Sequence, residues 1–249
     1  MARVVVSPEA RDGDAFVIEG EAYRHAVNVL RVARGDSFLV VDGSGHEFTC
    51  VAETLSSRSL RARVTQVRTL SPAPALSIHL CCGLLKGEKL DLVLQKGTEL
   101  GVARFTFFAG QRSTVRIDPR DEVSRRGRWQ RIVQGAVGQS GGGAYPDVDG
   151  PVSFDTVLTQ AVQADLAILA WEGDGHTPLP RLAAVLRGHA ALRTVAVLVG
   201  PEGGFSEGEI EAARAAGVTL VSLGARILRA ETAAVVMPAL LLAASGDLG

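Results

Sequence analysis

Residues 195–236, VAVLVGPEGGFSEGEIEAARAAGVTLVSLGARILRAETAAVV, constrain the fold of this chain more than any other stretch. Two apolar runs of strand length, Val195–Val199 and Val218–Leu223, each end in a glycine-bearing loop that opens on a helix-forming segment. Buried runs rich in β-branched residues that alternate with helices are typical of a parallel α/β sheet. Since open α/β sheets bind ligands at the carboxyl ends of their strands, we expect these loops to line a site on two adjacent strands.

The loops of this stretch carry signals that indicate where helices begin and end. Three glycines in GPEGG (200–204) permit a sharp turn and a close approach of another backbone or a ligand. Ser206 and Glu209 form a capping-box pattern, which predicts a helix that begins there and ends at Gly217. After the second loop, another helix is predicted to open at Glu231.

Several familiar chemistries have no motif in this chain. GPEGG is not followed by the Gly-Lys-Ser/Thr of a P-loop, and no acidic residue ends the next strand as in a dinucleotide site. Without HExxH, GxSxG or a cluster of His and Cys, neither a catalytic metal nor an activated nucleophile is indicated. What remains is a pocket whose main-chain groups hold a planar, weakly charged cofactor. Four apolar side chains are expected to enclose it: Leu198, Leu223, Ile227 and Leu228.

Charge is unevenly distributed along the 249 residues, whose net charge is −1. Residues 104–131 contain eight arginines against three acidic residues, whereas residues 132–249 contain six arginines, no lysine and twelve acidic residues. The basic segment favours a polyanionic partner, although an arginine-rich, solvated helix face has the same composition. With 47% hydrophobic and 21% charged residues, the chain can bury a full core and is not of the disordered type.

The cysteines and apolar runs indicate the compartment. Cys81 and Cys82 are adjacent in an apolar segment, which gives neither a disulfide framework nor a zinc-binding spacing, and predicts strand core residues in a reducing environment. The N-terminus lacks a signal-peptide pattern. The longest apolar run, Ala233–Ala244, contains Pro238 and is shorter than the roughly 20 residues that span a bilayer. We therefore expect a cytoplasmic protein with no membrane and no metal partner.

The first seventy residues have the rhythm of a small β-barrel. Strand-like runs separated by turn signals occur at Arg3–Val6, Ala15–Glu19, Ser37–Asp42, His46–Glu53 and Ser59–Val67. A helix is predicted at residues 21–31, with an apolar face comprising Ala22, Ala26, Val29 and Leu30. Its other face projects Arg24, His25, Asn28 and Arg31. Small barrels with a basic helix face often bind oligonucleotides.

After a proline-rich stretch at residues 69–75, the pattern changes to alternating strands and helices. Further strands are predicted at Leu76–Cys82, Arg104–Phe108 and Leu166–Trp171. Helices are predicted at Gly87–Leu100, Arg120–Gln139, Ser153–Gln163 and Thr177–Arg187. This alternation predicts an α/β domain with a mainly parallel sheet.

Several motifs occur together in an order that resembles one known family. LVGPEGGFSEGEI (198–210) and SLGARILRAETAA (222–234) are similar to the signature of the 16S ribosomal RNA uridine N3-methyltransferases, the RsmE family of the SPOUT superfamily. Four further segments resemble other parts of the family's sequence pattern: LLKGEKLDLVLQKGTELGV (84–102), QRSTV (111–115), residues 128–142 and HAVNVLRVARGDSFLVVDGSG (25–45). The resemblance extends over nearly the whole chain.

The resemblance implies a PUA-like RNA-binding β-barrel in residues 1–70, a linker in 71–75 and a SPOUT α/β-knot methyltransferase domain in 76–249. That domain has a mainly parallel sheet and a trefoil knot, which no periodicity in the sequence indicates, since knots are rare exceptions to topology rules. The cofactor implied is S-adenosylmethionine. The implied partners are 16S rRNA or the assembled small ribosomal subunit, methylated at N3 of a specific uridine, and a second copy of the chain in a homodimer.

The same resemblance assigns site residues. The residues expected to bind the cofactor, mostly through main-chain atoms, are Trp171, Gly200, Glu202, Gly203, Leu223, Gly224, Ile227 and Leu228. Trp171 could equally be an ordinary core or interface residue. Arg229 is expected to stabilise negative charge on the uracil carbonyl oxygens, because a guanidinium stays protonated and presents several donors; it could instead pair with Glu231. Glu202 is either the catalytic base or a structural residue that holds backbone amides. RNA phosphate contacts fall on Arg3, Arg24, Arg31, Arg112 and Arg116.

This chain also departs from the family pattern. Gly135, Gly138 and Gly142 stand where charged residues are usual, at a cost of about 1 kcal/mol each if they are helical. Ala225 replaces the usual proline of the second loop. Two alternatives therefore stay open: another SPOUT methyltransferase, acting on tRNA or on a ribose hydroxyl, and a non-catalytic RNA-binding assembly factor.

Overall fold

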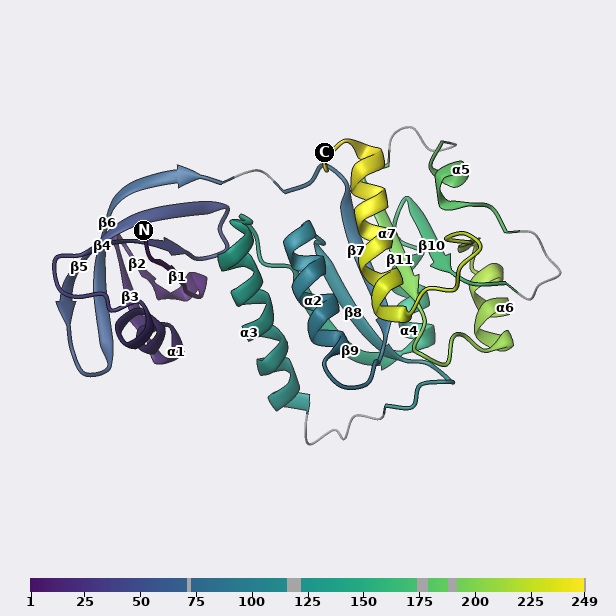
Figure 1. Ribbon diagram of the computed structural model, residues 1–249, viewed down its shortest axis with the longest axis horizontal. Helices are drawn as coiled ribbons and strands as arrows, with labels where there is room; N and C mark the ends of the chain where they lie inside the picture. The colour runs from purple at the N-terminus through teal and green to yellow at the C-terminus, as the bar shows by residue number, and fades with distance from the viewer. Residues whose placement is uncertain (71–72, 116–121, 174–178, 188–191, 249) are drawn as a thin grey trace. The chain divides into compact units, whose positions relative to one another are not determined.

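The computed structural model describes residues 1–70, 73–115, 122–173, 179–187 and 192–248 (Figure 1). Contacts within the chain divide it into two compact units. The first comprises residues 1–73 and 133–145, and the second comprises residues 74–132 and 146–249. The helix α3 (Glu122–Ser140) contributes residues to both units. The boundaries expected from the sequence, at residues 70 and 76, stay a prediction.

The first unit is built on a mixed six-stranded sheet. Its order is β1-β4-β5-β6-β3-β2, with β1 and β4 parallel and the other neighbours antiparallel. The strands are β1 (Arg3–Val5), β2 (Arg11–Asp12), β3 (Ala15–Glu19), β4 (Ser37–Val41), β5 (His46–Leu55) and β6 (Ser59–Thr69), with a 3-10 turn η1 (Pro8–Ala10). Alternate side chains, among them Val4, Phe16, Phe38 and Phe48, are buried in one core, as a sheet with one buried face requires.

One turn of the first unit differs from the helix expected at residues 21–31. The chain forms a short helix α1 (Gly20–Arg24) and then a π-helical turn η2 (His25–Val29). A π-turn takes more residues than an α-turn, so the side chains after it leave the α-helical periodicity. Ala26 is buried as expected, but Val29 is 64% exposed, and its prediction as an apolar-face residue is wrong. The polar face is exposed as expected, with Arg24, His25, Asn28 and Arg31.

The second unit is organised around a parallel six-stranded sheet, which confirms the predicted α/β class. Its order is β12-β10-β11-β7-β8-β9, and every neighbouring pair is parallel. The strands are β7 (Ser77–Gly83), β8 (Arg104–Ala109), β9 (Asp147–Ser153), β10 (Leu166–Ala170), β11 (Thr194–Val199) and β12 (Thr219–Val221). The sequence did not predict β9, because DVDGPVS is poor in apolar residues and contains Gly150 and Pro151, which are depleted in strands.

Helices cover both faces of this sheet (Figure 1). Helices α4 (Phe154–Ala161) and α6 (Glu207–Ala215) contribute to one apolar core, while α2 (Lys89–Leu100) packs against α7 (Ala230–Ser245), which contacts β7 and β11. A short helix, α5 (Leu182–Arg187), precedes β11. Cys81 and Cys82 of β7 are both fully buried free thiols, which confirms their predicted place in a strand core.

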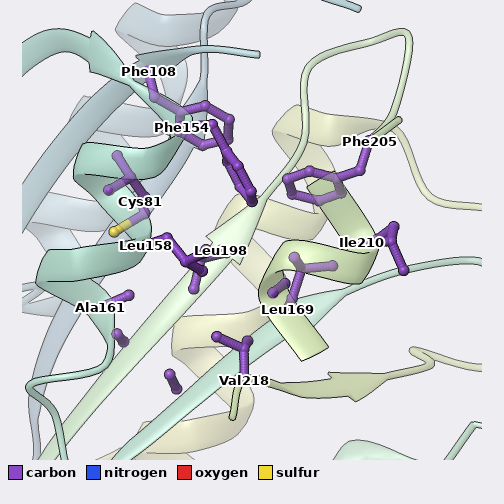
Figure 2. Packing of buried hydrophobic residues seen from close by; sticks show 14 of the residues in the cluster. Cys81, Phe108, Phe154, Leu158, Ala161, Leu169, Leu198, Phe205, Ile210 and Val218 are labelled. Carbon is purple, nitrogen blue, oxygen red and sulfur yellow. The ribbon is translucent and has the colours of Figure 1, made fainter. Parts of the chain in front are cut away.

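Three aromatic rings pack at one end of the core under α4 and α6 (Figure 2). Phe108 from the end of β8, Phe154 from the start of α4 and Phe205 after β11 have ring centroids 5.5 to 6.2 Å apart. Aromatic pairs of this kind contribute roughly 0.5–1.5 kcal/mol beyond the burial of their surface. Because Phe205 follows GPEGG directly, this packing fixes that loop to the sheet.

Helix α6 begins as the sequence predicts. The amide of Glu209 donates to Ser206 Oγ, and the amide of Ser206 donates to the Glu209 carboxylate at 2.8 Å. Gly217, with φ +84°, follows its end. Helix α7 carries the apolar run, and Ala234, Met237 and several neighbours are buried in the core. No helix in the described ranges is both long and apolar enough to cross a membrane.

The glycines of the 135–142 segment have different roles. Gly142 lies beyond the end of α3, so the cost expected for a helical glycine does not arise there. Gly138 is helical, and a Cβ there would lie 2.4 Å from Val5 Cγ2, so only glycine permits this approach to β1. A Cβ on Gly135 would meet no atom within 4 Å.

Candidate active site

Three loops meet at the carboxyl edge of the parallel sheet. They follow β10, β11 and β12, and they span residues 170–173, 199–205 and 222–230. The expectation that the last two strands are adjacent is wrong, because β10 lies between them and pairs with both. Parallel strands nevertheless end at the same edge, so all three loops emerge together, at the place where open α/β sheets bind ligands.

These loops line a cavity of about 450 Å³. Its walls comprise Lys89, Ala170, Glu172, residues 199–205, residues 227–231 and Ala233. A cavity of about 370 Å³ adjoins it, lined by residues 170–173, residues 222–228 and Ala233. Because the two cavities share Ala170, Glu172, Ile227, Leu228 and Ala233, they are adjoining parts of one site.

Glycines shape this site for different physical reasons. A Cβ on Gly203 would lie 2.7 Å from the carbonyl oxygen of Arg112, so the two loops approach closely only because the side chain is absent. Gly204 and Gly224 have φ of +69° and +121°, a backbone conformation that residues with a side chain rarely adopt. The loop that carries Arg112 is held further by Glu209, whose carboxylate accepts from the amide of Gln111 at 2.8 Å.

A cluster of opposite charges forms one wall of the larger cavity. Lys89 Nζ, at the start of α2, donates to Glu202 Oε1 at 2.9 Å and lies 3.7 Å from Glu231 Oε2. The amide of Lys86 also donates to Glu202 Oε1, at 3.0 Å. GPEGG is therefore tied to the segment after β7 through the carboxylate of Glu202.

The hydrogen bonds from Lys86 and Lys89 also lower the pKa of Glu202. Burial acts to raise the pKa of the carboxyl, but the donors from the Lys86 amide and the Lys89 ammonium outweigh it, so the pKa is lowered. The hydrogen bond with Glu202 in turn raises the pKa of Lys89. The pair is thus fully charged near neutral pH. Because a carboxylate with a lowered pKa is a weaker proton acceptor, the geometry favours the structural alternative for Glu202.

Arg229 lies at the N-cap of α7 and lines the larger cavity. Its backbone is extended, with φ −65° and ψ 153°, and its side chain is exposed. Trp171 lines the smaller cavity, packs against the aromatic core and is covered by the guanidinium of Arg214, 5.5 Å from the ring centroid. Both alternatives considered for Trp171, pocket wall and core residue, are thus compatible with its position.

The structure brings every predicted cofactor residue to the two cavities. Gly200, Glu202 and Gly203 line the larger one, Trp171, Leu223 and Gly224 line the smaller one, and Ile227 and Leu228 line both. Their contacts with a cofactor stay a prediction. The expectation for Leu198 is wrong: it is fully buried in the core under α4 and α6. Successive side chains of a strand point to opposite faces, and Leu198 points to the face that α4 and α6 cover.

Two charged residues of the cavity wall, Lys89 and Glu231, were not predicted as part of the site. A signal for Lys89 was available, because it begins the first helix after β7, whose carboxyl end lies at the same sheet edge as β11. Glu231 follows the predicted Arg229 by two residues. What no sequence pattern indicated is that Lys89 lies between two of the carboxylates.

The arginines predicted to contact RNA have different surroundings. Arg24, Arg31 and Arg112 are exposed. Arg31 has φ +57°, which is uncommon for a residue with a side chain. Arg3 pairs with the buried Glu47 at 2.5 Å and donates to the carbonyl of Gly138 at 2.9 Å, which gives it a structural function. Arg116 lies outside the described residues. All RNA contacts stay predictions.

The basic segment of the sequence is partly neutralised in the second unit. Arg128 forms an ion pair with Asp91 of α2, and Arg126 pairs with Asp149 of β9 at 3.2 Å. Both acidic partners are distant in the sequence, so the charge count overstated the free positive charge. Among the residues that the structure describes, no group of His, Cys, Asp and Glu could hold a metal ion.

Comparisons with known proteins agree with both units. Residues 71–242 match the family model described as an RNA methyltransferase domain, and residues 18–65 match an RNA methyltransferase PUA domain. The ribosomal RNA small subunit methyltransferase E of Bacillus subtilis is 30% identical over 226 residues, which cover 90% of this chain and 88% of that protein. The enzyme of the same name from Mycobacterium bovis is 30% identical over 228 residues, covering 90% and 84%.

A solved structure agrees with these sequences. The ribosomal RNA small subunit methyltransferase E of Neisseria gonorrhoeae, bound to S-adenosylmethionine, superposes with a TM-score of 0.83 at 28% identity and covers 98% of this chain and 97% of its own. These matches confirm the predicted fold, a SPOUT methyltransferase domain with a PUA-like barrel. The chain is an enzyme that belongs to the ribosomal RNA small subunit methyltransferase E family.

Proposed function

We propose that this protein transfers the methyl group of S-adenosylmethionine to N3 of a specific uridine in the 16S rRNA of the small ribosomal subunit. The chain belongs to the family, and one observation supports the proposal. The loops after β10, β11 and β12 of this chain line one site, and Arg229 lies in the wall of that site. Such a substrate places the enzyme in the cytoplasm.

The residues present fit the cofactor. Bound there, S-adenosylmethionine supplies an electrophilic methyl group on a positively charged sulfonium. The carboxylates of Glu172, Glu202 and Glu231 line the cavity and match that charge. The close approach at Gly203 and the positive φ at Gly224 leave main-chain groups for hydrogen bonds with a planar ring. Leu223, Ile227 and Leu228 provide apolar surface, and Ile227, which is 82% exposed, becomes covered when a ligand is bound.

Arg229 suits the stabilisation of charge on the substrate. As N3 loses its proton, negative charge develops on the two flanking carbonyl oxygens of the uracil ring. A guanidinium stays protonated at all relevant pH values and offers several donors in a fixed plane. Arg229 is exposed at the cavity wall, so it can reach a base that enters from solvent. The base must leave its stack to enter, as in other enzymes that modify nucleobases.

The barrel of the first unit and the Arg112 loop are proposed to hold the RNA. Arg24 and Arg31 are exposed beside the π-helical turn, and turns of this type are frequent at functional sites. Arg112 is exposed on the loop whose backbone contacts GPEGG. Phosphate contacts from these arginines position the strand without reading its sequence.

Calorimetry and a transfer assay test the proposal together. The protein is titrated with S-adenosylmethionine and then incubated with methyl-labelled cofactor and either free 16S rRNA or assembled small subunits. We expect binding, and label in RNA from at least one of the two substrates. A protein that binds neither S-adenosylmethionine nor its demethylated product contradicts the enzyme proposal, and cofactor binding with label only in tRNA contradicts the proposed substrate.

A further inference from the structure

We infer that Glu231 accepts the N3 proton of the uracil during methyl transfer. The inference rests on the proposed function and adds the base that the sequence left open. The new N3–methyl bond forms while the methyl–sulfur bond breaks, and the electron pair of that bond stays on sulfur. The electron pair of the N3–H bond stays in the ring, and the proton goes to a carboxylate oxygen of Glu231 and from there to water.

The position of Glu231 suits this role. It lies in the first turn of α7, two residues after Arg229, and it lines the 450 Å³ cavity. Its side chain keeps 12% of its surface exposed while its Oε2 is buried, so a base in the cavity would approach the carboxyl group from the side of Oε1. A group that accepts a proton must come within hydrogen-bond reach of it, and a position in the cavity wall allows this for a base that enters the cavity.

The hydrogen bonding of Glu231 also distinguishes it. Its Oε2 is buried, and among the described residues no donor forms a hydrogen bond with it. Buried polar atoms in folded proteins are nearly always hydrogen-bonded, and an exception calls for an explanation, of which a catalytic role is one. In contrast, Glu202 Oε1 already accepts from the Lys86 amide and from Lys89 Nζ. Of the two carboxylates beside Lys89, Glu202 is therefore held in place by two donors, whereas Oε2 of Glu231 accepts from no donor among the described residues.

Charged groups from several elements surround Glu231. Facing it are Lys89 of α2, Glu202 of the GPEGG loop, Arg229 at the N-cap of α7 and the thiol of Cys82 in β7. Burial, and then the nearby Cys81, Glu202 and Glu231, raise the pKa of Cys82, so that this thiol stays neutral. Glu172 lines the same cavity. Once Glu231 is protonated, Lys89 and Arg229 remain as cations that stabilise the negative charge on the uracil oxygens.

The test is the pH dependence of single-turnover methylation by wild type and Glu231→Gln, with the product identified in both. The glutamine side chain has nearly the same shape but cannot accept the proton, so the variant depends on uracil that is already ionised. We expect a rate about 10²–10³-fold lower at pH 7. We also expect the loss to shrink tenfold per pH unit on raising the pH, because ionised uracil increases in that proportion. Cofactor affinity by calorimetry should stay within threefold of wild type.

Two further variants keep the result interpretable. Glu231→Asp retains a carboxylate and should recover at least tenfold over Glu231→Gln with the wild-type pH profile. Glu211→Gln, an exposed residue of α6, should match wild type. A rate for Glu231→Gln within threefold of wild type at pH 7, or a loss of the same size at every pH, overturns the inference. If the wild type itself makes no 3-methyluridine, the proposed function fails instead, which the product analysis reveals separately.

Discussion

At the scale of single residues, Arg229 is the side chain on which the chemistry most depends. Arg229→Ala removes donors that act on charge present mainly in the transition state, so we expect kcat to fall by about 10²–10³-fold. Cofactor affinity should change less than threefold, because the predicted contacts with S-adenosylmethionine are made by neighbouring main-chain atoms. Arg193→Ala, at the opposite end of β11, is the control. Equal losses in cofactor affinity and kcat would make Arg229 a residue that builds the pocket.

Gly203 tests whether the close approach of two loops matters for the cofactor. In Gly203→Ala the new Cβ lies 2.7 Å from the Arg112 carbonyl oxygen, so one loop must move. We expect the free energy of unfolding to fall by about 1–3 kcal/mol and cofactor affinity to weaken. Gly208→Ala is the matched control, since no atom lies within 4 Å of its Cβ and it is helical. Its stability should rise by roughly 0.5–1 kcal/mol, and its cofactor affinity should match that of wild type.

At the scale of elements, the two helical glycines of α3 should respond in opposite directions. Gly135→Ala adds a methyl group in open space and should raise the free energy of unfolding by about 1 kcal/mol. Gly138→Ala places a Cβ 2.4 Å from Val5 Cγ2, so we expect a net loss of about 1–3 kcal/mol as β1 and α3 move apart. Urea denaturation of both variants measures the difference, and similar values for the two would contradict the packing described here.

The pairing of β7 with β8 gives the fold a pH dependence. His79 of β7 bonds Thr106 Oγ1 at 2.8 Å, and burial, followed by the charge of Arg104, lowers its pKa to about 4. Because an unfolded histidine titrates near 6.5, between these values the unfolded chain binds a proton that the folded chain does not. The contribution of neutral His79 to the free energy of unfolding is thus fully present above pH 6.5, and it is lost as the pH falls toward 4.

His79→Gln should flatten this dependence. Between pH 7 and pH 5 we expect the wild type to lose on the order of 1–2 kcal/mol more than the variant, measured by denaturant unfolding at both pH values. Glu202, Asp165 and Asp247, whose pKa values are lowered, are common to both proteins and cancel in the difference. An identical loss in both proteins would show that His79 titrates normally in the folded state.

Sequence patterns predicted where single helices and strands occur better than they predicted which of these elements lie next to each other. The capping box of α6 and the apolar run of β11 are local signals, and both elements are where they were expected. The insertion of β10 between β11 and β12 is set by long-range pairing, which periodicity does not contain. Likewise, the π-helical turn that exposes Val29 depends on a change of helix type, which the spacing of apolar residues does not indicate.

The same division holds for the site. The glycines at 200, 203 and 224 could be recognised in the sequence, because positions with a close backbone approach or a positive φ favour glycine. The cluster of Lys89, Glu202 and Glu231 was not, since it joins the start of α2 to loops more than a hundred residues later. Side-chain pairs of this kind become visible only when the strand order is known.

At the scale of the whole molecule, we propose that the active form is a homodimer, as the family resemblance implies. Leu240 of α7 is 46% exposed, an apolar side chain that a second copy could cover. We expect sedimentation velocity to show a dimer at micromolar concentration, and Leu240→Asp to shift it toward monomer with a parallel loss of methylation. Leu55→Asp changes an exposed leucine of the first unit and should stay dimeric. A monomeric, fully active wild type would contradict the proposal.

The central claim concerns the atom that receives the methyl group. The direct measurement is mass spectrometry of nucleosides from small-subunit rRNA after incubation of the purified protein with methyl-labelled S-adenosylmethionine. The site described here predicts that the label is in 3-methyluridine, at one position and in near-stoichiometric amount, and that Arg229→Ala reduces it strongly. Label in a 2′-O-methylated ribose or at a ring carbon, or no transfer to rRNA at all, would contradict the account.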